Sequence, residues 1–160
     1  MFSDDLDKAL ATFVLANGAA ATGQKVTIFF TFWGLNVIKK LHKPKTEKDI
    51  FGKMFGMMLP SSSGKLKLSK MSMGGIGGKM MRYIMNKKGI DSLESLRQQA
   101  LENGVEFIAC QMSMDVMGVK QEELLDEVTV GGVATYMERA DNANAVSYTH
   151  LRAHETCADL

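Results

Sequence analysis

One cysteine, Cys110, stands where a thiol can do chemistry. It follows the apolar run Val105 to Ala109, which predicts a buried strand, and it precedes Gln111 to Gly118, which predicts a short helix. Backbone N–H groups and the helix dipole at such a junction favour the thiolate, the nucleophilic form of cysteine. The candidate donors are the amides of Met112, Ser113 and Met114. The alternative is that Cys110 is a small buried hydrophobe at a strand end, and spacing alone leaves both interpretations open.

Two further loops are expected to meet the cysteine. Thr31, Phe32 and Trp33 follow a second predicted strand, Lys25 to Phe30, and Gly131-Gly132 follows a third, Val128 to Val130. In open parallel sheets, ligands sit beyond the carboxyl ends of the strands, so these loops should converge on one site. Besides Cys110, the predicted site consists of residues from the first of these loops and from the segment that follows the cysteine: Thr31, Phe32, Trp33, Gln111, Met112, Ser113 and Met114.

Helical patterns alternate with these strands along the chain. Apolar spacing, capping residues and glycine stops predict helices at residues 5–22, 35–41, 47–58, 79–87, 92–103, 122–125 and 133–141. Strands that alternate with helices at this spacing require crossover connections, which are typical of a mainly parallel sheet covered on both faces. The sequence thus predicts an α/β domain.

Composition limits the class of protein. The chain has 160 residues, of which 46% are hydrophobic and 23% charged, and this balance suits one globular domain. No apolar run approaches the roughly 18 to 20 residues that span a bilayer, and the acidic first residues do not resemble a secretory signal. We therefore expect a cytoplasmic protein, in which both cysteines are thiols.

The segment Lys53 to Lys88 is basic and rich in methionine. It has eight Lys or Arg residues, no Asp or Glu, and eight of the 13 methionines. Methionine suits a surface that repacks against a partner, although charge runs are usually solvated faces. We expect that this segment does not bind nucleic acid, because few aromatic residues are interleaved with the basic ones. The glycine cluster Gly74 to Gly78 fits neither a phosphate loop nor a dinucleotide fingerprint, and we interpret it as a flexible hinge.

Three longer segments resemble a known family. FSDDLDKALATFVLANGAAATG, VTIFFTFWGLNVIKK and EFIACQMSMDVMGV are similar to the DsrE/DsrF/DsrH-like sulfur-carrier proteins, and the resemblance runs from about Phe2 to Asn144. It implies a flavodoxin-like three-layer sandwich and places Cys110 at the family's sulfur-binding cysteine. It also implies rhodanese-type or small sulfur-carrier partners, a homo-oligomer (trimer or hexamer), and no organic cofactor or metal.

Both ends of the chain depart from this family pattern. The family carries an apolar first strand before the segment that here begins at Phe2, and only Met1 precedes it. The last residues, from about Val146, resemble a non-native tail. We therefore expect residues 1–145 to form the domain, with a truncated first strand, and we exclude residues 146–160, including Cys157.

Three functions are compatible with these features. The leading hypothesis is a sulfur carrier or sulfurtransferase that holds sulfane sulfur or a thiosulfonate group on Cys110 and passes it to an acceptor thiol. The second is a non-catalytic interaction subunit whose basic, Met-rich loop at residues 53–88 binds an acidic partner or a membrane surface peripherally. The third is a peroxide-reducing thiol protein, against which the lack of a resolving cysteine argues.

Overall fold

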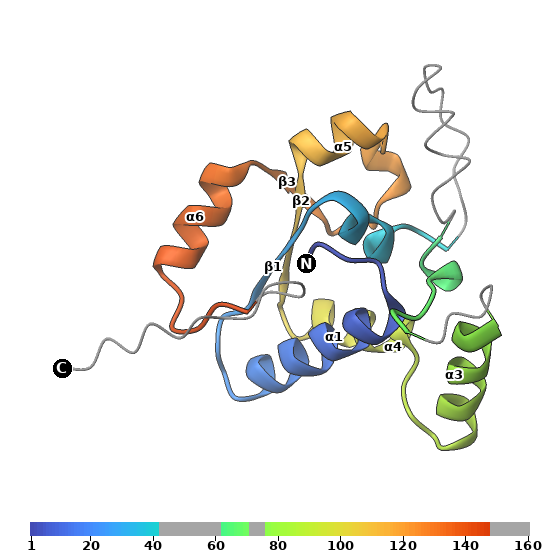
Figure 1. The fold of residues 1–160 in the computed structure, drawn as a ribbon. Helices are drawn as coiled ribbons and strands as arrows, with labels where there is room; N and C mark the ends of the chain where they lie inside the picture. Colours follow the sequence, from blue (N-terminus) through green and yellow to red (C-terminus); the bar gives the residue numbers. More distant parts are fainter. Residues whose placement is uncertain (42–61, 71–75, 148–160) are drawn as a thin grey trace.

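The computed structural model describes residues 1–41, 62–70 and 76–147. In chain order its elements are α1 (Leu6–Ala21), β1 (Thr27–Phe30), the 3-10 helix η1 (Phe32–Ile38), the 3-10 turn η2 (Ser63–Lys65), α3 (Ile76–Lys87), α4 (Leu93–Glu102), β2 (Glu106–Cys110), α5 (Gln111–Met117), the 3-10 turn η4 (Gln121–Glu123), β3 (Thr129–Gly131) and α6 (Val133–Asp141) (Figure 1).

The strands form one parallel sheet in the order β1-β2-β3. Thr27 pairs with Glu106 at one end of the β1-β2 ladder, and Cys110 pairs with Gly131 at the end of the β2-β3 ladder. Each pair of neighbouring strands is joined by a crossover that contains helices. The predicted α/β class with a parallel sheet is confirmed, and the arrangement is consistent with a flavodoxin-like fold.

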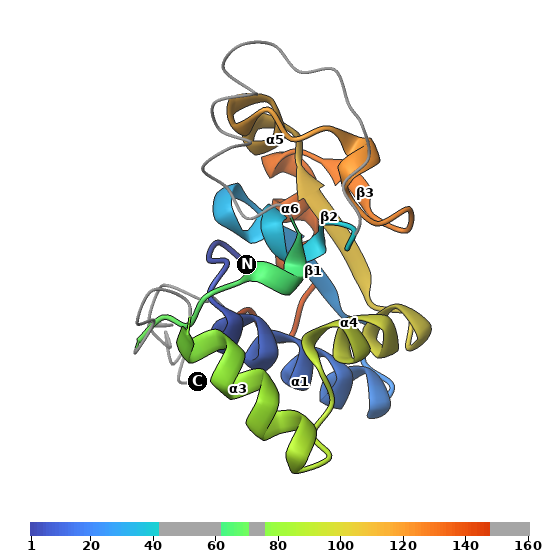
Figure 2. The same ribbon diagram turned by 90° about the vertical axis from the view of Figure 1, so that its right-hand side faces the viewer.

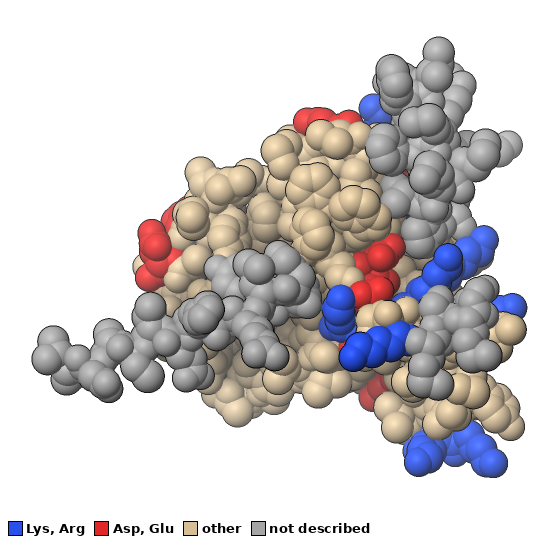
Figure 3. All heavy atoms as spheres, viewed as in Figure 1, with Lys and Arg blue, Asp and Glu red and all other residues tan. Residues whose placement is uncertain are grey.

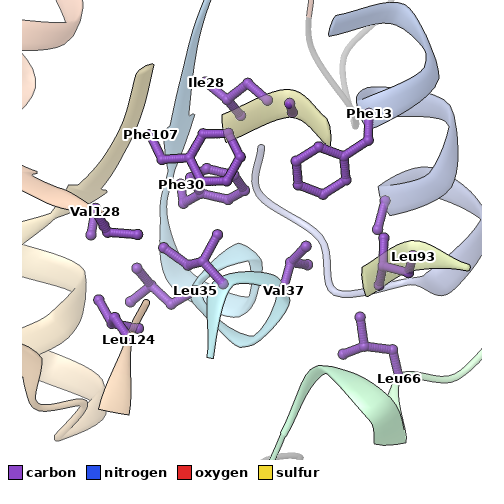
Figure 4. Close-up of a cluster of buried hydrophobic side chains, with 14 of the residues drawn as sticks. Phe13, Ile28, Phe30, Leu35, Val37, Leu66, Leu93, Phe107, Leu124 and Val128 are labelled. Atoms are coloured by element: carbon purple, nitrogen blue, oxygen red, sulfur yellow. The ribbon is translucent and has the colours of Figure 1, made fainter. Parts of the chain in front are cut away.

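Helices cover the two faces of this sheet. Because side chains alternate along a strand, Phe30 and Phe107 point to one face, where they meet Phe13 of α1 in the main apolar core (Figure 4). Helix α4 packs beside α1 under the same face (Figure 2). The opposite face carries Phe29, whose ring lies 5.3 Å from that of Tyr136 in α6. The result is three layers.

The first residues run along the outer edge of β1. The Met1 amino group donates to the Phe29 carbonyl, and the Thr31 amide donates to the Met1 carbonyl at 3.0 Å. This is the bond pattern of a parallel strand pair. Gly34 then donates to the Phe2 carbonyl at 3.0 Å, and a Cβ at position 34 would collide with the Met1 backbone. Glycine there allows η1 to pack directly on the start of the chain.

Most predicted elements lie where the sequence placed them, with three corrections. The helix expected at 35–41 is a 3-10 helix that starts earlier, at Phe32, and the helix expected at 122–125 is a 3-10 turn. Of the predicted glycine hinge, Gly77 and Gly78 are instead buried inside α3, where a Cβ at Gly78 would lie 3.1 Å from the Leu66 carbonyl oxygen, and Gly74 and Gly75 lie outside the described residues. The helix expected at 47–58 lies outside the described residues.

No helix in the described part of the chain is long and apolar enough to cross a membrane.

Helix α6 is held to the sheet by an ion pair that should respond to pH. The Glu106 carboxylate accepts from Arg139 Nε at 3.0 Å and from Thr27 Oγ1 at 2.9 Å. The bonds from Arg139 are the main reason that the pKa of Glu106 lies below its usual 4.5. This contribution to stability is therefore complete above pH 4.5 and is lost as the pH falls through the lowered folded-state pKa.

We expect Glu106→Gln to release α6 at neutral pH, since a neutral amide forfeits the charge-assisted bonds. Hydrogen exchange should accelerate in residues 133–141 while remaining slow in α1. Glu102→Gln is the matched control, because Glu102 is exposed on α4 and pairs only with its helix neighbour Gln98 in the described hydrogen bonds. Equal exchange in both variants would show that the ion pair does not hold α6.

Candidate functional site

Cys110 occupies the junction between β2 and α5. It is the last residue of the strand rather than the first residue beyond it, and it is also the N-cap residue of the helix. Strand alternation puts its side chain on the same face as Ile108 and Glu106, which is the face that α6 covers. The thiol therefore lies on the far side of the sheet from α1 and α4.

The thiol is buried. Cys110 is only 2% exposed, and it is a free cysteine. Neither it nor Ile108 belongs to the main apolar cluster around Phe13. Its side chain makes no capping hydrogen bond to α5, so the amide donors that we expected at the sulfur are not engaged by the thiol.

The two expected loops do meet beside the cysteine. The Thr31 and Ser113 hydroxyls lie 2.8 Å apart, and this bond joins the end of β1 to the first turn of α5. Ser113 is fully buried, so a hydroxyl without a partner would be costly there. The structure thus brings together Thr31, Cys110 and Ser113 across a span of more than 80 residues.

Gly131 forms the third side of this region. It pairs with Cys110, and a Cβ at position 131 would lie 2.8 Å from Ile108 Cγ2 and 3.3 Å from Thr135 of α6. A side chain there would push α6 away from the sheet face that carries the cysteine. Gly131-Gly132 was expected to be one of the converging loops, and Gly131 is the partner of Cys110 in the β2-β3 ladder.

We expect Gly131→Ala to destabilise the fold by about 1–3 kcal/mol, because it overpacks a buried contact. Gly132→Ala is the matched control, since a Cβ at position 132 would meet nothing within 4 Å and its φ of −103° is available to any residue. Urea titration of both variants tests this difference. If the two unfold at the same urea concentration, the close approach of α6 to Gly131 is not tight in solution.

An aromatic cluster lies at the end of β1. The rings of Phe2, Phe32 and Trp33 lie 5.5 to 6.0 Å from one another. Phe32 has a φ of 47°, which is strained for a residue with a side chain, and such strain is concentrated at functional sites. Trp33 is 47% exposed and borders an open hollow of about 260 Å³ with Phe2, Ser3, Asp4 and Lys8. Cys110 does not line this hollow.

The remaining predicted site residues are dispersed. Gln111 is exposed and donates to Asp115 within α5 at 2.9 Å, and Met112 is exposed on the same helix. Met114 is buried in the main core, where it packs with the apolar cluster. Of these two methionines, Met112 therefore faces solvent and Met114 faces the core.

Sequence reasoning missed a buried polar pair near the hollow. Asn36 is fully buried in η1, and its amide nitrogen donates to Asp4 at 3.0 Å. Burial is the main cause that raises the pKa of Asp4 above its usual 3.8. The Asn36 amide oxygen has no hydrogen-bond partner among the described residues. Asp4 and Asn36 are 32 residues apart in the chain, so the local sequence pattern gave no signal for this pair.

Comparison with known proteins defines the class. The DsrE/DsrF/DrsH-like family matches residues 1–146, and the chain belongs to this family. It is 43% identical over 144 residues to the uncharacterized protein YrkE of Bacillus subtilis, and the matched region covers 90% of each chain. It is also 38% identical over 147 residues to the sulfur carrier protein DsrE2 of Allochromatium vinosum, covering 89% of this chain and 91% of that protein. The resemblance found in the sequence is confirmed.

Proposed function

We propose that this protein is a cytoplasmic sulfur carrier that holds sulfane sulfur or a thiosulfonate group on Cys110 and passes it to an acceptor thiol. The observation that carries the proposal is the position of Cys110, a free thiol at the carboxyl end of the central strand, in a chain of this family. The relative named as a sulfur carrier supports the same role. Cys110 is the one cysteine among the described residues.

The transfer consists of two thiol exchange steps. The Cys110 thiolate attacks the terminal sulfur of a donor persulfide, the donor's S–S bond breaks, and the donor leaves as a thiolate. An acceptor thiolate then attacks the terminal sulfur on Cys110, and Cys110 leaves as a thiolate. With tetrathionate as the donor, Cys110 gains the thiosulfonate group and thiosulfate leaves. No external oxidant is needed in either exchange.

The burial of Cys110 sets a condition on this chemistry. A donor cannot reach the sulfur of a side chain that is 2% exposed, so loading requires local opening around the thiol. The Thr31–Ser113 bond and the close approach of α6 to Gly131 are two described contacts in this region that such opening would disturb. Once loaded, the terminal sulfur is about 2 Å from the cysteine sulfur, because that is the length of an S–S bond.

Intact mass spectrometry under non-reducing conditions tests the proposal. The protein is incubated with polysulfide, tetrathionate or thiosulfate, and the same treatment is given to Cys110→Ser. Cys157→Ser is the matched control, because it removes the other cysteine of the chain. We expect an added sulfur or thiosulfonate mass that a thiol removes, present in Cys157→Ser and absent in Cys110→Ser. An adduct that follows Cys157, or no adduct at all, would refute the proposal.

Partner binding of Cys110→Ser and a further incubation with peroxide separate the rival functions. A non-catalytic interaction subunit should show no adduct, and its partner binding should survive Cys110→Ser. A peroxide-reducing thiol protein should form a sulfenic acid with peroxide much faster than it takes up sulfur.

We also propose that donor and acceptor are rhodanese-type or small sulfur-carrier proteins and that the chain forms a trimer or hexamer, as the family resemblance implies. Mixing with a persulfide-loaded rhodanese should transfer sulfur to Cys110, and sedimentation should give the mass of the assembly. Failure of transfer from the rhodanese, with loading from polysulfide intact, would overturn the choice of donor alone.

A further inference from the structure

Helix α3 presents an apolar stripe to solvent. Ile76, Met80, Tyr83 and Ile84 are spaced at four, seven and eight residues from the first, so they form one face of the helix, and all four are exposed. Ile90, just beyond the helix, is exposed as well. Large apolar side chains are usually exposed singly, so a row of this kind marks an interaction surface.

The opposite face of α3 fixes the helix to the domain. Gly77, Gly78 and Met85 are buried, and Met81 packs against the main core. Arg82 turns inward, where Nη1 lies 3.4 Å from Glu94 and Nη2 donates to the Ser63 carbonyl at 3.1 Å. Packing and an ion pair therefore keep the stripe facing outward. A rotation of α3 that buried the stripe would break both.

Positive charge surrounds this stripe. Lys79 and Lys88 lie on its two sides, and Lys87 lies in line with it at the end of the helix, where its long stem can follow the apolar surface. The preceding segment adds the exposed residues Lys65, Lys67 and Lys70. No acidic residue occurs between positions 62 and 88. Figure 3 shows Lys and Arg gathered on the side of the molecule that carries α3.

We propose that the outer face of α3 docks on an anionic lipid surface. An apolar stripe bordered by lysines is the pattern of a helix that lies in the interface plane of a bilayer, with its apolar side chains among the acyl chains and its ammonium groups at the headgroups. A second copy of this chain fits poorly, because a symmetric contact would oppose these lysines to their own equivalents. The surface is independent of Cys110.

Vesicle flotation with the full chain tests this docking. Vesicles of phosphatidylcholine with phosphatidylglycerol should bind the protein, vesicles of phosphatidylcholine alone should bind it weakly, and added salt should release it. Lys79→Gln with Lys88→Gln should weaken binding about 30-fold, from roughly fivefold per lysine. The same charge loss in Lys25→Gln with Lys120→Gln, two exposed lysines outside α3, should leave binding within about twofold of the wild type.

Met80→Ser tests the apolar part of the docking face. It should weaken binding roughly fivefold, because the half-exposed side chain loses its lipid contact. The matched control is Met137→Ser on α6, since Met80 is 49% exposed and Met137 54% exposed. Equal binding to charged and neutral vesicles, equal effects of the two methionine variants, binding to an acidic protein but not to vesicles, or a dimer lost with Met80→Ser would each overturn the proposal.

Discussion

Arg97→Ala should lower the free energy of unfolding by about 3–5 kcal/mol. Arg97 in α4 is only 5% exposed, and its Nη1 donates to the carbonyls of Val37 at 2.8 Å and Lys39 at 3.2 Å. These carbonyls end η1, the 3-10 helix that begins directly after Thr31. Burial lowers the pKa of Arg97 from its ordinary value, yet the guanidinium stays charged and supplies charge-assisted bonds. Its removal leaves a cavity and deprives both buried carbonyls of this donor.

Urea unfolding followed by circular dichroism measures this loss. Lys40→Ala is the control, since Lys40 pairs with the exposed Asp126 at 2.7 Å and such pairs contribute about 0–1 kcal/mol. The unfolding midpoint of Arg97→Lys should lie between those of Arg97→Ala and Lys40→Ala, because lysine keeps the charge but lacks the planar set of donors of a guanidinium group. If Arg97→Ala and Lys40→Ala have the same unfolding midpoint, Arg97 does not tie α4 to η1.

Phe107→Ala should lower the free energy of unfolding by a similar amount, about 3–5 kcal/mol. The Phe107 ring is 1% exposed, and its centroid lies 5.7 Å from that of Phe13 and 5.5 Å from that of Phe30. One residue thus joins α1, β1 and the strand that carries Cys110. Typical domains have a total stability of only about 5–15 kcal/mol, so this truncation should shift the urea midpoint far downward.

Two other variants keep this prediction testable if the alanine protein does not fold. Phe107→Leu retains most of the apolar volume and should cost less than about 1.5 kcal/mol. Phe29→Ala removes a partly buried ring from the other face of the sheet, where it meets only Tyr136 among the ring contacts of the described residues, and should cost about 1–2 kcal/mol. Thermal unfolding that ranks Phe29→Ala as the more damaging change would contradict the assignment of the main core to the Phe107 face.

Local patterns predicted the regular elements well. A helix was expected at 92–103, and Ser92 caps α4 at its start, where its side chain accepts from the Ser95 amide at 3.1 Å. Gly132 was expected to precede the last helix, and α6 begins at Val133 as predicted. These features succeed because caps, glycine stops and apolar periodicity act within a few residues. The start of η1 was missed, and there the chain makes a distant contact that local patterns do not contain, because Gly34 packs against Met1, more than 30 residues earlier.

By itself, the sequence determined the class of fold, the family and the position of Cys110 at the end of a strand, because periodicity and motif residues are local properties of the chain. Only the tertiary structure decided that the thiol is buried on the face under α6, that Thr31 bonds Ser113, and that Met114 belongs to the core. It alone turned the apolar face of α3 outward as well. Burial and side-chain pairing depend on which distant segments pack together, and no spacing along the chain encodes that.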